Sequence, residues 1–176
     1  MLVINHFLIL RIRFGNRDMK KTCKFCWGLS ALLVVAMATT AYMFVIRGSV
    51  VASDDGRTAI ILTAGERDLV LAEMRGFLES VQAITAGLAE KDMAAISESA
   101  HTVGMANAQE VPAALVSKLP LEFKQLAMKT HKAFDELATE AQDMGEGQVV
   151  LTKLSEMMLN CTACHAAFRF EVEAGP

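Results

Sequence analysis

The chain has 176 residues, 53% of them hydrophobic, which is enough for the core of one ordinary domain and for one apolar appendage. Residues 1–52 carry seven Lys and Arg against a single acid, Asp18, whereas residues 53–176 carry ten Lys and Arg against nineteen Asp and Glu. The second part, with a net charge of about −9, argues against nucleic acid as a partner and favours proteins with a basic docking surface.

The N-terminal segment predicts an export signal or a membrane anchor. Residues 27–46 contain no charged side chain, and Lys20, Lys21 and Lys24 precede them. Twenty apolar residues rise about 30 Å as a helix, which is enough to cross the hydrocarbon core of a membrane. Because the positive flank keeps the N-terminus in the cytoplasm, the chain after Arg47 is expected on the periplasmic side.

Two fates of this segment remain open. The small residues at Val50-Val51-Ala52 fit cleavage by a signal peptidase, which would release a soluble periplasmic protein. The length of the apolar run instead favours an uncleaved anchor in the inner membrane, since signal-peptide cores usually have about 7–15 residues. Met19, followed by two lysines, is an expected natural start. Cys23 and Cys26 lack a following His and are interpreted as incidental.

The exported part is expected to begin with a polar linker, residues 53–57, followed by a domain over residues 58–176. Apolar residues recur there at steps of 3 and 4, which predicts helices over residues 58–90, 93–105, 121–143 and 148–173. Asp92 suits the N-cap of the second helix, and Pro120 precedes the third. We found no strand pattern, so the predicted fold is all-α: an antiparallel four-helix bundle behind an N-terminal transmembrane or signal helix.

The strongest motif is Cys161-Thr-Ala-Cys164-His165 in the last predicted helix. Each cysteine sulfur of such a motif adds across one haem vinyl group, and the spacing of two residues matches the separation of the vinyls. His165 lies one helical turn from Cys161, so its imidazole can reach the iron from the same side. There are three alternatives: a structural disulfide, a thioredoxin-like pair and a zinc site. The sequence lacks the βαβ setting that a thioredoxin-like pair requires and the fourth ligand that a zinc site requires.

The chain resembles the class II c-type cytochromes, which include cytochrome c-prime and its low-spin, methionine-ligated relatives. The resemblance rests on the position of the haem motif, in a fourth helix close to the C-terminus, and covers roughly residues 58–174. It implies one covalent haem c held by Cys161 and Cys164, His165 as proximal iron ligand, and electron transport between redox partner proteins. It also implies that a homodimer can form. No acid–base pair, nucleophile or second metal set appears in the sequence, so no enzymatic activity is expected.

The resemblance further implies that the distal iron ligand comes from the first helix. Met74, on the apolar stripe with Val70, Phe77 and Val81, is the expected ligand, although a Met on such a stripe is often core filler. A thioether ligand favours ferrous iron and raises the reduction potential. His101 and His131 are the alternative ligands. Arg67, Arg75 and Arg169 are candidates for pairing the haem propionates.

Three functions therefore remain in view. The first is a monohaem electron carrier with Met74 and His165 on the iron. The second is a five-coordinate protein of the cytochrome c-prime type, which binds nitric oxide or carbon monoxide with Met74 off the iron. The third is a haem-free helical interaction protein with an incidental cysteine pair.

Overall fold

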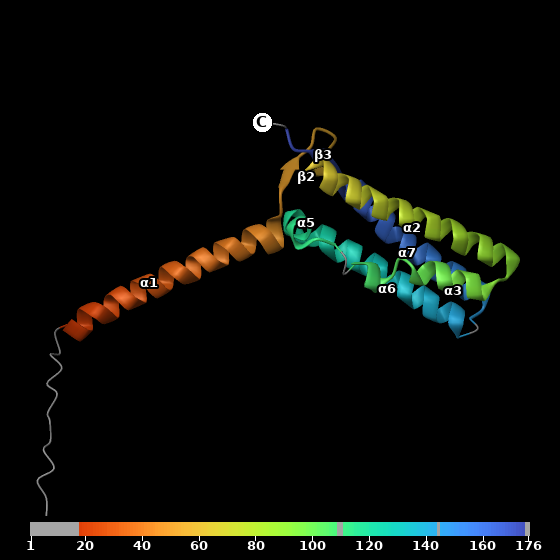
Figure 1. Cartoon of the computed structure of the whole chain (residues 1–176), viewed down its shortest axis with the longest axis horizontal. Helices are drawn as coiled ribbons and strands as arrows, with labels where there is room; N and C mark the ends of the chain where they lie inside the picture. The colour runs from red at the N-terminus through yellow and green to blue at the C-terminus, as the bar shows by residue number, and fades with distance from the viewer. Residues whose placement is uncertain (1–17, 109–110, 144, 175–176) are drawn as a thin grey trace, which may run out of the picture. The chain divides into compact units, whose positions relative to one another are not determined.

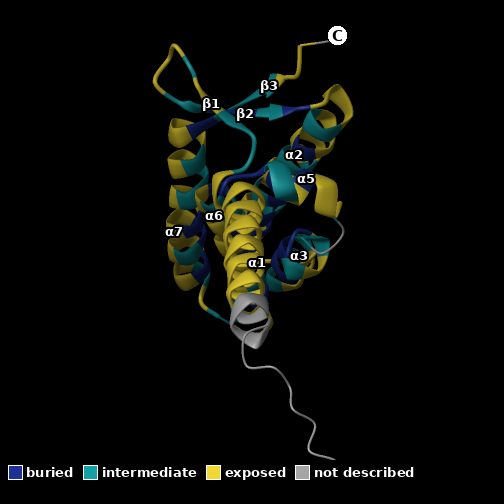
Figure 2. Cartoon of the chain, turned by 90° about the vertical axis from the view of Figure 1, so that its left-hand side faces the viewer, coloured by how far each residue is buried: buried dark blue, intermediate teal, exposed yellow. Residues whose placement is uncertain are grey.

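In a computed structural model of the chain, residues 18–108, 111–143 and 145–174 are described. Contacts divide the chain after Thr40 into an N-terminal unit and a compact unit. The N-terminal unit contains α1 (Asp18–Ala41). Its side chains from Lys24 onward are exposed (Figure 2), and the segment Lys24–Arg47 is long and apolar enough to cross a membrane. The predicted N-terminal apolar helix is therefore confirmed, and its length and composition are consistent with a signal sequence or an anchor.

The compact unit is mostly helical (Figure 1). It begins with a π-helical turn, η1 (Tyr42–Arg47), and its four long helices are α2 (Ala64–Glu90), α3 (Met93–His101), α6 (Leu121–Gln142) and α7 (Gly147–Ala167). Two short helices, α4 (Met105–Ala108) and α5 (Ala113–Lys118), lie between α3 and α6. The predicted caps are present: the side chain of Asp92 accepts a hydrogen bond from the Ala95 amide at 3.0 Å, and Pro120 immediately precedes α6.

The four long helices share one apolar core. α3 packs against α2 and α6, and α6 packs against α7. The side chains of Phe134, Leu137, Ile84 and Ile96 are fully buried in this core. Phe77 of α2 stacks on Phe134 of α6 with their ring centroids 5.5 Å apart. These contacts bring together segments that are distant in sequence, as the helical stripes predict.

The prediction that the domain contains no strands is wrong. Three strands, β1 (Val50–Ala52), β2 (Thr58–Leu62) and β3 (Phe168–Val172), form a small mixed sheet in the order β1-β2-β3. β1 pairs antiparallel with β2, and β2 pairs parallel with β3. Residues 53–57, predicted as a linker, form the turn between β1 and β2. The first predicted helix therefore included Thr58–Leu62, which form β2. The last predicted helix included Phe168–Val172, which form β3.

The sheet builds a second apolar cluster at one end of the helices. Ile60 and Leu62 of β2 are fully buried in it, together with Phe123 of α6 and Phe168 of β3. The ring of Phe123 contacts Phe168 edge-on, with centroids 5.6 Å apart. Because β3 follows α7 without a break, this cluster holds the C-terminal end of α7, where the cysteine motif lies.

Candidate functional site

A cavity of about 520 Å³ lies between α2, α6 and α7. Such a volume is within the usual range of small-molecule and cofactor sites. Its walls are almost wholly apolar, and they include Met74 from α2 and Cys161, Cys164 and His165 from α7. The cavity therefore brings together every haem-binding residue expected from the sequence, from two helices that are far apart along the chain.

The wall formed by α7 carries the cysteine motif over one turn of helix. Cys161 and Cys164 are partly buried free thiols; Cys161 packs against the core of the four helices, and Cys164 packs against the cluster at the sheet. Burial raises the pKa of Cys161, and burial together with the nearby Cys161 raises the pKa of Cys164 to about 11. Both sulfurs are thus protonated at neutral pH, unlike the acidic thiols of thiol–disulfide exchange enzymes.

The wall formed by α2 presents Met74. This side chain is partly buried and packs against both apolar clusters, so it lies at the junction between the helical core and the sheet end. Leu71, Leu78 and Val81 lie beside it on the same wall. The thioether is held by neighbouring apolar groups and faces a space in which a soft metal could be ligated.

The wall formed by α6 completes the enclosure. Phe123, Leu126, Ala127 and Thr130 line it. The hydroxyl of Thr130 donates to the carbonyl of Leu126 at 2.9 Å, so its hydrogen-bonding capacity is used within its own helix. The α6 wall consequently offers an apolar surface to the cavity.

The three arginines expected near cofactor carboxylates have different environments. Arg75 lines the cavity, whereas Arg67 pairs with Asp68 and Arg169 pairs with Asp55 and Glu171. Of these three arginines, only Arg75 therefore lines the cavity.

An unpredicted arginine lies at the end of the motif. A guanidinium nitrogen of Arg57, in the β1–β2 turn, lies 3.5 Å from the backbone oxygen of His165. Asp55 bridges Arg57 and Arg169, and its hydrogen bonds with Arg57 hold the pKa of the Asp55 carboxyl well below its usual range. A cation beside a carbonyl of the last helical turn is favourable, so this turn stabilises the end of α7.

The two alternative histidine ligands do not line the cavity. His131 is only 2% exposed; its Nδ1 donates to the Val103 carbonyl at 2.8 Å, and its Nε2 lies 3.2 Å from a carboxylate oxygen of Glu73. Its ring meets the ring of Phe77 edge-on. His101 is largely exposed and lies 3.7 Å from Asp135. Both ring nitrogens of His131 are thus already engaged by protein groups.

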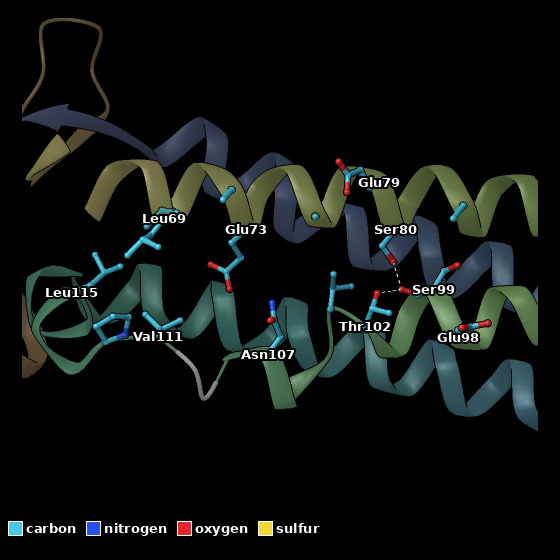
Figure 3. A pocket seen from close by; sticks show the side chains of 16 residues that line it. Leu69, Glu73, Glu79, Ser80, Glu98, Ser99, Thr102, Asn107, Val111 and Leu115 are labelled. Atoms are coloured by element: carbon cyan, nitrogen blue, oxygen red, sulfur yellow. Dashed lines mark hydrogen bonds between the residues drawn. The ribbon is translucent and has the colours of Figure 1, made fainter. Parts of the chain in front are cut away.

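Glu73 also lines a second cavity, of about 710 Å³, on the other face of α2. Figure 3 shows Glu73 and Asn107 pointing into this space, and Ser80 and Thr102 hydrogen-bonded to the backbone oxygen of Ser99. Carboxylates and hydroxyls make this cavity more polar than the space around Met74. It offers none of the cysteine chemistry of the motif.

We expect His131 to make the stability of the domain depend on pH, because both of its ring nitrogens contact protein groups. Burial lowers the pKa of His131, but hydrogen bonds to Glu73 and Val103 outweigh burial and leave the pKa raised above 6.5. The stabilisation is therefore complete below about pH 6.5 and is lost as the pH rises through the raised value. We expect the urea midpoint of unfolding to fall as the pH rises above about 6.5. His131→Gln should flatten this dependence and His101→Gln should not; equal behaviour of the two variants would contradict it.

The remaining alternatives for the motif receive little support from this geometry. Among residues 18–108, 111–143 and 145–174, no three His, Cys, Asp or Glu side chains are grouped as a metal-binding set, which disfavours a zinc site.

Cys26 is exposed on α1 and is a free thiol. The side chain of Cys23, and the residues before Asp18 that a start at Met19 would remove, lie outside the described part of the chain.

Comparisons of the chain with protein-family models, with curated proteins and with solved structures find no match. The cavity and its lining residues are accordingly the basis for any assignment of function.

Proposed function

We propose that this chain is a monohaem c-type cytochrome that carries electrons on the periplasmic side of the inner membrane. Cys161 and Cys164 would hold the haem covalently, and His165 and Met74 would ligate its iron. One observation carries this proposal: a single apolar cavity is lined by the Cys-x-x-Cys-His motif of α7 and by the expected distal ligand of α2. Helix packing alone brings these residues to one space.

The residues present fit the covalent attachment of haem. Each thiol adds across a vinyl group: a carbon–sulfur bond forms, the thiol hydrogen goes to the other vinyl carbon, and no oxidant is required. Cys161 and Cys164 are free, partly buried thiols whose pKa values are raised by burial, so each sulfur retains the hydrogen that this addition transfers. The bound haem would supply an iron that alternates between ferric and ferrous states, and Met74 would offer this iron a soft ligand that favours the ferrous state.

The proposal also includes the way in which the four long helices are arranged. We interpret α2, α3, α6 and α7 as an antiparallel four-helix bundle, in which the cofactor occupies the end capped by the sheet. Bundles commonly place cofactors between facing helices in this way. No acid–base pair or nucleophile accompanies the motif in the cavity lining, so we assign the chain a carrier role rather than an enzymatic one. Its acidic surface suits redox partners with a basic docking face.

A second function is favoured by one specific observation. Met74 packs against both apolar clusters, and these contacts suffice to explain its presence without an iron ligand. If Met74 stays in that packing, the iron is five-coordinate and binds nitric oxide or carbon monoxide. The two functions share the covalent haem and His165, and they differ only in what Met74 contacts.

The proposal is tested by expressing the full chain in a host that matures c-type cytochromes. We expect haem that remains attached after denaturation, seen as a pyridine haemochrome spectrum and as a mass increase of one haem. The double variant Cys161→Ala/Cys164→Ala should lose the attached haem, whereas the matched variant Cys23→Ala/Cys26→Ala should keep it. A colourless wild-type protein with free thiols at 161 and 164 would leave only a haem-free interaction protein.

A further inference from the structure

The end of the apolar N-terminal segment is built into the compact unit. The π-helical turn η1 packs against α5 and α6. The ammonium group of Lys124, on α6, donates to the backbone oxygens of Phe44 and Val45, both at 3.1 Å. Carbonyls in the last turn of a helix have no amide partner within the helix, and a cation is favourable there. Lys124 therefore caps the end of the apolar segment from a distant helix.

The residues that follow are equally fixed. Gly48 ends η1 with a φ of 67°, and a Cβ at this position would overlap the backbone of Lys118 and Leu119. The Ser49 amide donates to the Lys118 carbonyl at 2.7 Å, and the Ile61 amide donates to the Ser49 carbonyl at 2.8 Å. Only Gly48 and Ser49 separate η1 from β1, and both are held against the domain, so no free linker exists at this point.

The sequence that resembles a signal-peptidase site lies inside the fold. Val50, Val51 and Ala52 form β1, which pairs with Ile60, Ala59 and Thr58 of β2. Val50 also packs against the apolar cluster at the sheet. Cleavage after Ala52 would remove an edge strand, the η1 turn and the partner of Lys124. Release of the domain would thus cost the compact unit part of its own structure.

We infer that the N-terminal helix is retained as a membrane anchor, because η1, Gly48 and Lys124 form a fixed junction within the compact unit, in the segment that follows α1. Helix α6 carries both Lys124 and four residues that line the apolar cavity, namely Phe123, Leu126, Ala127 and Thr130. At 1.5 Å per residue, this wall extends only about 10 Å along α6. Retention of the helix does not depend on the proposed function.

Retention is tested by intact mass. The full chain is produced in a host that exports proteins and matures cytochromes, and the membrane and soluble fractions are weighed by mass spectrometry. We expect a membrane-bound chain that includes residues 27–46 and resists extraction at alkaline pH. A soluble chain beginning at Ser53 would overturn the inference. The haem increment is measured in the same spectrum, so failure of haem attachment is distinguished from loss of the helix.

The fixed junction is tested by trypsin, which cuts after Arg47 only when this segment leaves the domain. In the full chain in lipid nanodiscs, Lys124→Met should release the fragment that begins at Gly48 about tenfold faster than the wild type. Lys132→Met, on the exposed face of the same helix, is the matched control and should not accelerate release. Equal release rates in the two variants would show that Lys124 does not fix the junction.

Discussion

Replacing Met74 by alanine should convert a six-coordinate, low-spin haem into a five-coordinate one. The thioether of Met74 is the expected distal ligand in the α2 wall, and alanine cannot reach the iron from that wall. We expect loss of the far-red sulfur–iron band, gain of carbon monoxide binding in the reduced state, and a fall in reduction potential on the order of 100 mV, a modest part of the ~0.8 V range that axial ligands cover. Absorption spectra and potentiometric titration measure these changes.

Met158→Ala is the matched control for this experiment. Met158 lines the same cavity, but it lies on α7 together with His165 and so presents its sulfur from the proximal side. Its replacement should leave the sulfur–iron band and the spin state unchanged. If Met74→Ala also leaves the spectrum unchanged, Met74 is a packing residue and the gas-binding function replaces the electron carrier.

The long helices could be predicted because a core built from helices requires apolar residues at steps of 3 and 4. The residues at which these helices begin and end were harder to predict. The first helix was predicted from residue 58, yet Thr63 and Glu66 form a capping box in which the Thr63 hydroxyl accepts from the Glu66 amide and the Glu66 carboxylate accepts from the Thr63 amide. This Thr-x-x-Glu pattern is present in the sequence and marks the start of α2.

The sheet escaped prediction for two reasons. In β3, Phe168 and Phe170 alternate with Arg169 and Glu171, a period of two that continues the apolar stripe of α7 closely enough to be mistaken for more helix. The partner strand β2 is separated from β3 by all the long helices of the domain. Parallel pairing over such a distance leaves no local signature, because each strand gains its hydrogen bonds only after the helices have packed.

Some residues of the candidate site could likewise be predicted from the sequence, and others could not. Cys161, Cys164 and His165 could be predicted because the chemistry of haem attachment fixes their spacing within one turn of a single helix. Met74 required a family resemblance, since its sequence context is that of an ordinary core residue. Arg57 could not be predicted: it reaches His165 only because the sheet brings the β1–β2 turn to the end of α7.

Phe77→Ala should cause the largest loss of stability among single substitutions on α2. The ring of Phe77 is nearly buried, stacks on Phe134, meets the buried His131 edge-on and forms part of the cavity wall. Removing it leaves a hole that the surrounding helices cannot fill, which typically costs about 3–5 kcal/mol of unfolding free energy.

Urea unfolding of the full chain, compared with Leu69→Ala, measures this difference. Leu69 lies on the same helix but is 53% exposed, so its truncation should cost less than about 1 kcal/mol. Phe77 is also the only residue of the cavity lining in ring contact with His131 within the described part of the chain, so the variant should alter the pH dependence of stability as well as its magnitude. Comparable losses in the two variants would mean that α2 does not pack on α6 through Phe77, and the cavity that holds Met74 opposite the cysteine motif would then lack its supporting wall.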